Sequence, residues 1–157
     1  FRHHYSSLPW SADAIAIGSG LAVGVFWVLL AERGGKEASG IATALATLPP
    51  ALVAIWIALR LIGTVLLVPL VEEMFFRGYV MARLDRGGLV WRLIAIALST
   101  ALFAALHGRW IEAAIAGIVF AVVMLRRGRV ADAVISHLAA NATVAAAALI
   151  TRDFSLI

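Results

Sequence analysis

The chain has 157 residues, of which 63% are hydrophobic and only 14% are charged, and its mean hydropathy is +0.99. A soluble domain of this length needs a largely polar surface, so the composition indicates a membrane protein and argues against a soluble one. The formal net charge of +4 does not indicate nucleic-acid binding, because the arginines form short clusters between apolar runs. The absence of cysteine excludes disulfides, thiolate metal sites and a cysteine nucleophile within this sequence.

The first apolar run extends from Ala12 to Ala31 and is long enough to cross about 30 Å of hydrocarbon. Within it, Gly20 and Gly24 are four residues apart, a spacing that lets another helix approach closely. Glycine is frequent in membrane helices in any case, so dimerisation through this pair is the less favoured alternative. The residues from Glu32 to Glu37 have mixed charges and turn glycines, and they predict a solvated loop.

The next long helix is predicted to begin at Pro49 and Pro50, since proline is tolerated in the first turn of a helix. Residues 51–84 form a stretch that is too long for one straight span. We therefore expect it to tilt, to project from the membrane, or to break near Pro69. Arg60, within the apolar part, either reaches a polar region, pairs inside the protein or marks a second position for a break.

The remainder of the chain contains apolar runs at 89–106, 111–125 and 130–150. The densest basic cluster lies at 126–129, and the basic loop at 83–92 precedes it by two spans. Both loops should therefore lie on the same side of the membrane, which the positive-inside bias identifies as the cytoplasmic side. The chain as a whole predicts an all-α fold, a polytopic bundle of about five to six membrane helices.

Two adjacent carboxylates, Glu72 and Glu73, lie inside the long apolar helix. A charge at the bilayer centre costs from about 2.5 to well over 10 kcal/mol, so intramembrane acids are candidates for function. On a helix the two side chains point about 100° apart and cannot share one role. Glu73 precedes Arg77 by four residues, a spacing that favours an ion pair and leaves Glu72 as the freer carboxylate. The alternative is that both acids mark a helix end at the water interface.

Three more polar residues in or beside the later apolar runs are candidates for function. His107 follows Phe103 by four residues, and His137 precedes Asn141 by four, so each pair shares a helix face. The structural alternatives are a buried histidine with one satisfied nitrogen and polar contacts between helices. Counting the rise per residue from the basic side, His107 lies deeper than the other polar groups and needs a tilt to come level with them.

One carboxylate, two imidazoles and one carboxamide form a plausible set for hydrolysis. Glu72 can take a proton from water that His107 orients, and His137 and Asn141 can donate to the oxyanion formed from a peptide carbonyl. Glu72, His107 and His137 can equally be ligands of zinc. The types of side chain do not separate these two mechanisms.

Three segments carry a resemblance to a known family. Glu72–Gly78, Phe103–His107 and His137–Asn141 resemble, in order and spacing, the three motifs of the CPBP intramembrane proteases. That family includes type II CAAX prenyl endopeptidases and bacteriocin-processing or self-immunity proteins. The resemblance covers residues 66–148, roughly half of the chain. The run His107–Trp110 also resembles the protease module attached to some bacterial exosortases, which implies a sorting-related membrane-protein substrate.

The resemblance implies a metal-independent glutamate endopeptidase of a bacterial inner membrane. It implies no cofactor, with zinc as the less favoured reading, and its partners are membrane lipid and a membrane-associated peptide or protein, with no nucleic acid. The implied catalytic residues are Glu72, His107, His137 and Asn141, and the supporting residues are Glu73, Arg77 and Phe103.

Two other functional classes remain open from the sequence alone. A non-catalytic membrane scaffold or immunity protein would keep the fold and bind a partner. A proton-coupled transporter would also use intramembrane Glu and His, although the chain has no internal repeat of the kind found in many transporters. The first residue is Phe1, and the polar opening lacks the order of a signal peptide, so we expect residues 1–157 to be one domain excised from a longer protein.

Overall fold

The computed structural model describes residues 11, 13–31 and 36–157, and throughout these residues the regular elements are helices. Two of the helices are long and apolar enough to cross a membrane, Pro50–Leu84 and Val130–Thr151. Shorter apolar helices, Ala14–Leu29 and Leu89–Ala105, accompany them. The predicted all-α membrane bundle is therefore confirmed.

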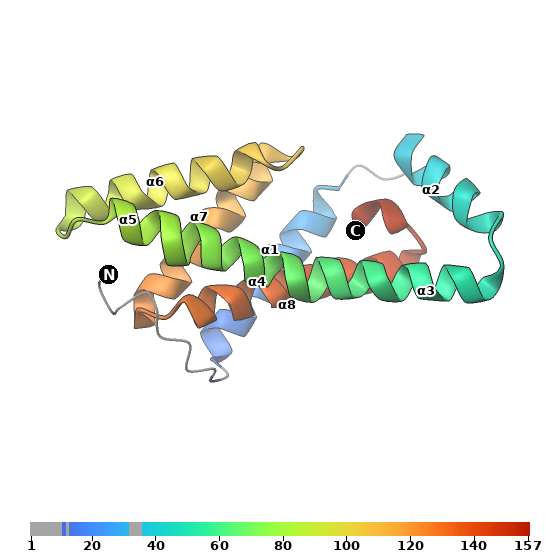
Figure 1. Cartoon of the computed structure of the whole chain (residues 1–157), viewed down its shortest axis with the longest axis horizontal. Helices are drawn as coiled ribbons and strands as arrows, with labels where there is room; N and C mark the ends of the chain where they lie inside the picture. The colour runs from blue at the N-terminus through green and yellow to red at the C-terminus, as the bar shows by residue number, and fades with distance from the viewer. Residues whose placement is uncertain (1–10, 12, 32–35) are drawn as a thin grey trace.

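The bundle is formed by one long helix and four further helices, of which α6 and α8 pack directly on the long helix (Figure 1). The four are α1 (Ala14–Leu29), α6 (Leu89–Ala105), α7 (Trp110–Arg127) and α8 (Val130–Thr151). Helix α8 contacts α1, α7 and the middle of the long helix, and α6 contacts α7 and the second half of the long helix. Helix α8 therefore joins α1 and α7 to the middle of the long helix.

The two basic loops lie at the same end of the bundle, on the left in Figure 1. The loop between the long helix and α6 turns at Gly87 and Gly88, whose φ angles are 93° and 82°. The loop between α7 and α8 turns at Gly128, whose φ is 68°. The predicted common side is confirmed, and its assignment as the cytoplasmic side stays a prediction.

The long helix runs without interruption for 35 residues, about 52 Å at 1.5 Å per residue. Its parts are α3 (Pro50–Leu61), the π-helical η1 (Ile62–Leu67), α4 (Val68–Glu73), the π-helical η2 (Met74–Met81) and α5 (Ala82–Leu84). Among the alternatives for this stretch, a break near Arg60 or Pro69 is wrong. The wider π turns accommodate the proline, and the α3 end instead projects past α6 and α7 (Figure 1).

The N-terminal elements are shorter than the sequence predicted. Helix α1 begins after Asp13, whose carboxylate accepts a hydrogen bond from the Ala16 amide. The predicted loop at residues 32–37 extends too far, because α2 (Lys36–Ala46) already begins at Lys36. Lysine and glutamate, which occupy the first two positions of α2, both favour helix. Residues 1–10, 12 and 32–35, including the predicted polar opening and the first residue of the predicted span, lie outside the described residues.

Gly20 and Gly24 are the contact points between α1 and α8. A Cβ atom added at Gly20 would lie 2.0 Å from the Ser136 carbonyl oxygen, and one added at Gly24 would lie 2.5 Å from Thr143 Cβ. A hydrogen bond of 3.1 Å between the Ser19 and Ser136 hydroxyls crosses the same contact. The predicted close helix approach is confirmed, and it is made within the chain, so the two glycines are not free to pair with a second copy.

We expect Gly20→Ala to destabilise the protein by about 1–3 kcal/mol, because the added methyl group forces α1 and α8 apart. Gly18→Ala is the matched control, since nothing lies within 4 Å of a Cβ atom there. That control should be neutral or stabilising by up to about 1 kcal/mol through helix propensity. Thermal unfolding of both variants in detergent measures the difference. Equal stability of the two variants would contradict this packing.

Candidate active site

A cavity of about 310 Å³ lies inside the bundle, bounded by α1, the long helix, α6, α7, α8 and the C-terminal 3₁₀ turn η3 (Phe154–Leu156). Most of its wall is apolar. The polar side chains in that wall include all four of the predicted catalytic residues, Glu72, His107, His137 and Asn141. The structure therefore brings together residues that are as many as 69 positions apart in the sequence, from Glu72 to Asn141.

Glu72 lies on α4, the six-residue α-helical segment between the two π-helical segments. Its Oε2 atom is 3.9 Å from Nε2 of His137. That oxygen is buried and makes no hydrogen bond to any described residue. Glu72 therefore presents to the cavity a carboxylate oxygen that is not engaged in holding the fold.

Glu73 points away from the cavity into the core. Its Oε1 atom is 3.0 Å from Arg77 Nη1, and both side chains are fully buried. Arg77 Nη2 donates to the Gly117 carbonyl at 2.9 Å, and its guanidinium carbon lies 4.6 Å from the centre of the Phe103 ring. The ion pair predicted from the spacing is present. The alternative of two acids at a helix end in water is wrong for Glu73, because the long helix continues past it and buries it.

His137 is held by the same Glu73 oxygen. Its Nδ1 atom is 2.9 Å from Glu73 Oε1, and its ring stacks on Phe120 at 4.5 Å between centroids. A carboxylate beside an arginine accepts hydrogen bonds, so Nδ1 carries the proton and Nε2 faces Glu72. Sequence reasoning missed this contact, because the spacing assigned Glu73 to Arg77 alone.

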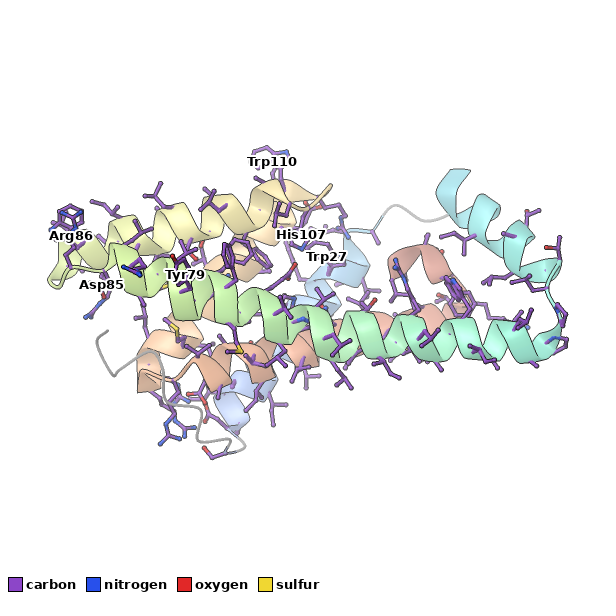
Figure 2. The ribbon with its side chains drawn as sticks, in the orientation of Figure 1. Trp27, Tyr79, Asp85, Arg86, His107 and Trp110 are labelled. Atoms are coloured by element: carbon purple, nitrogen blue, oxygen red, sulfur yellow. The ribbon has the colours of Figure 1, made fainter. Side chains whose placement is uncertain are left out.

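His107 lies in the turn after α6, not on the helix itself. Its Nδ1 atom is 2.8 Å from the Phe103 carbonyl oxygen, which can only accept, so Nδ1 is the donor and the neutral ring has a bare Nε2. The ring lies against Phe103 and faces Trp27 of α1, at 4.5 and 6.3 Å between centroids (Figure 2). His107 lines the same cavity as Glu72, so the two groups come level, although the depth estimate from the sequence placed His107 deeper.

Arg109 fixes Trp27 beside His107. It donates to the Trp27 carbonyl at 3.0 Å, its guanidinium carbon lies 4.6 Å from the Trp27 ring centre, and it pairs with Glu112 at 3.0 Å. Sequence reasoning missed this cluster, which joins the end of α1 to the start of α7. The available signal was an arginine two residues after His107, a candidate catalytic residue.

Asn141 is positioned by a proline on the long helix. In η1 the backbone bonds run from residue i to i−5, as from the Val68 amide to the Gly63 carbonyl. The next bond in this series would join residue 69 to the Thr64 carbonyl, but Pro69 has no N–H. Asn141 Nδ2 donates to that free carbonyl at 2.8 Å. One amide hydrogen of Asn141 is thereby fixed, and the second remains a donor in the cavity wall.

We expect Pro69→Ala to loosen Asn141 without unfolding the protein. The restored N–H would compete for the Thr64 carbonyl, and alanine favours helix more than proline does. If Asn141 donates to the reacting oxygen, the cleavage rate should fall by roughly tenfold while thermal stability is kept or raised. A rate equal to that of the wild type, with stability unchanged, would contradict the role given to this proline.

The possible metal ligands can be assessed from their geometry. Within the described residues, no group of three or more His, Asp or Glu side chains is arranged to hold a metal ion. His107 and His137 are both fixed through Nδ1, an arrangement that zinc-binding histidines also use, so the ring orientations by themselves do not separate the two mechanisms.

The site falls within the part of the chain that is similar to known proteins. A family model described as type II CAAX prenyl endopeptidase Rce1-like matches residues 54–143, more than half of the chain. The matched range contains all seven residues predicted to be catalytic or supporting. No curated protein and no solved structure matches the chain. The chain therefore belongs to the Rce1-like family of type II CAAX prenyl endopeptidases.

Proposed function

We propose that this protein is an intramembrane endopeptidase that hydrolyses a peptide bond of a membrane-associated protein or peptide. The family is one of membrane peptide hydrolases. The observation that carries the proposal is the cavity inside the bundle, in which a carboxylate oxygen of Glu72 without a hydrogen bond shares a wall with His107, His137 and Asn141. Its apolar wall suits a substrate segment that arrives from the lipid phase.

The first step is activation of water between Glu72 and His107. The Glu72 carboxylate takes one proton from the water, while the bare Nε2 of His107 accepts the other hydrogen as a hydrogen bond and orients the oxygen. The oxygen attacks the carbonyl carbon of the peptide, and the carbonyl oxygen takes up the negative charge. Phe103 supports this step, because its carbonyl fixes the His107 tautomer.

The second step needs donors for the oxyanion. The free amide hydrogen of Asn141 is one donor. His137 can donate from Nε2 only when both of its nitrogens are protonated. At this stage Glu72 holds the proton from water, so the charges of Glu73, Arg77 and His137 sum to +1, which the negative charge of the oxyanion balances. Glu73 therefore supports the reaction through His137 as well as through Arg77.

The third step is departure of the amine. The proton held by Glu72 passes to the nitrogen of the broken peptide bond, which regenerates the carboxylate. One product gains the water oxygen in its new carboxyl group, and the other gains a new amino group. The balance needs one water molecule and no other reactant, and none of the three steps uses a metal or cofactor.

The test is a comparison of membrane proteins from cells that carry either the wild type or the Glu72→Gln variant. A protein with a new terminus only in the wild-type membranes supports the proposal and identifies the substrate. If both membranes contain the same termini while the cells still depend on the protein, the chain acts as a non-catalytic scaffold or immunity protein. The identity of any processed protein also tests the sorting-related substrate implied by His107–Trp110.

The zinc mechanism is tested separately on purified protein. We expect cleavage to survive exhaustive chelation, with no stoichiometric metal found by elemental analysis. Loss of cleavage on chelation and its return with zinc would replace the proposed mechanism with the metal-dependent one.

A further inference from the structure

Helix α1 forms a wall of the cavity that has no part in the catalytic scheme. The family match covers residues 54–143, so α1 lies outside the matched range. Three residues of α1 nevertheless line the cavity, Val23, Gly24 and Trp27. Trp27 has by far the largest side chain of the three, and it lies beside His107, which orients the attacking water in the proposed mechanism (Figure 2). The indole therefore borders the place where the peptide bond is cleaved.

The indole of Trp27 is held in position by several contacts. The guanidinium carbon of Arg109 lies 4.6 Å from the centre of the Trp27 ring, and Arg109 also donates to the Trp27 carbonyl at 3.0 Å. Glu112 holds Arg109 through an ion pair of 3.0 Å. Trp27 packs in addition against two clusters of buried apolar residues. Rotation of the indole away from an incoming side chain would break these contacts, so the indole acts as a fixed wall.

The space beside this wall is small. The centres of the Trp27 and His107 rings are 6.3 Å apart at an interplanar angle of 75°, so the edge of one ring meets the other and no side chain fits between them. The whole cavity, at about 310 Å³, is at the lower end of the range of about 300–1,000 Å³ for ligand pockets. The rest of the α1 wall is Val23 and Gly24, so Trp27 sets the room available on this side.

We propose that Trp27 determines the size of one substrate side chain beside the cleaved bond and restricts it to glycine, alanine or serine. The inference rests on the proposed function, since it concerns the bond that the water attacks. The attacked carbonyl carbon must come within about 3–3.5 Å of the water that His107 orients. The side chains of the two residues that form this bond then lie close to His107, and the one directed toward α1 meets the fixed indole. A large side chain there would displace Trp27 from Arg109, as in an overpacked core.

The test compares the cleavage of one peptide library by the full chain and by its variants in liposomes. The probe is a library of N-acylated decapeptides with randomised internal positions. Mass spectrometry of the products identifies each cleaved bond and its two flanking residues, and products that also form with Glu72→Gln are discarded. At one flanking position, we expect the wild type to cleave beside glycine, alanine or serine roughly tenfold faster than beside leucine or phenylalanine.

Trp27→Ala should reduce this ratio at the same position to less than about threefold, because the space left by the indole accepts the larger side chains. Trp27→Phe should give an intermediate ratio. Trp56→Ala is the matched control and should keep the wild-type ratio, because Trp56 contacts Phe154 and is outside the cavity wall formed by the described residues. A uniform loss of activity leaves the ratio unchanged, so a merely structural role of Trp27 would not alter it.

A wild type that cleaves beside small and large residues at equal rates would overturn the size restriction. An unchanged ratio in Trp27→Ala, or an equal fall in Trp56→Ala, would overturn it as well. If Trp27→Ala does not fold or does not cleave, the ratio of Trp27→Phe decides in the same way, and failure of both variants assigns Trp27 to the fold and overturns the proposal. Absence of any Glu72-dependent cleavage by the wild type rejects the proposed endopeptidase, whereas cleavage without a size preference rejects the restriction alone.

Discussion

The Glu72→Gln variant should remain folded and lose cleavage by roughly 10²–10⁴-fold, the range for loss of a positioned general base. The stability should change little, because Glu72 Oε2 makes no hydrogen bond to a described residue and its distance of 3.9 Å from His137 Nε2 is longer than a hydrogen bond. The amide has nearly the same shape as the carboxyl group but cannot take a proton from water. Single-turnover cleavage in liposomes, with thermal unfolding of the same preparation, measures both quantities.

A cleavage rate for Glu72→Gln within a factor of about three of the wild-type rate would remove Glu72 from the mechanism, since general-base loss is worth far more. A variant that is inactive because it is unfolded would instead assign Glu72 a structural role. The two outcomes are separated by the unfolding transition, which should match that of the wild type.

Replacing Arg77 should have the largest effect on stability. We expect Arg77→Met to cost about 3–5 kcal/mol, because it leaves the Glu73 carboxylate buried without its cation. The same change removes the donor to the Gly117 carbonyl and the contact with the Phe103 ring. Denaturation of the purified variant in mixed detergent and denaturant measures the loss.

The double variant Glu73→Gln/Arg77→Met separates charge from packing. Because it has no buried carboxylate at position 73, it should recover part of the stability lost in Arg77→Met. It should not recover cleavage, since His137 Nδ1 no longer faces a carboxylate. The buried ion-pair account would be contradicted if Arg77→Met were as stable as the wild type. It would also be contradicted if the double variant were less stable than Arg77→Met.

Several features of the fold followed from the sequence, because they depend on local geometry. The four-residue spacing of Glu73 and Arg77 predicted their contact, and the spacing of Gly20 and Gly24 predicted a close helix approach. The long apolar runs predicted the helices. The three motifs also led to the four polar residues of the cavity, although their catalytic roles stay predictions until the variants are measured.

Other features depend on contacts between distant segments, which spacing along one helix does not encode. Nothing in the pattern near Glu73 indicates that one of its oxygens also binds His137. The contact of Arg109 with Trp27 joins the start of α7 to α1, and the position of Arg109 two residues after His107 does not indicate Trp27 as its partner. The proline at position 69 did predict a disturbance, but the helix absorbed it with a π-helical segment whose free carbonyl binds Asn141, so the expected break did not occur.

The most direct measurement of the central claim follows the oxygen of water. Purified wild-type protein, stripped of metal and placed in liposomes with a substrate from the membrane comparison, should cleave it in water enriched in ¹⁸O. The account predicts that the new C-terminal carboxyl group of the product contains one ¹⁸O atom in a single turnover and that chelator leaves the rate unchanged. Cleavage that occurs only after zinc is added, or a product carboxyl group without ¹⁸O, would contradict it.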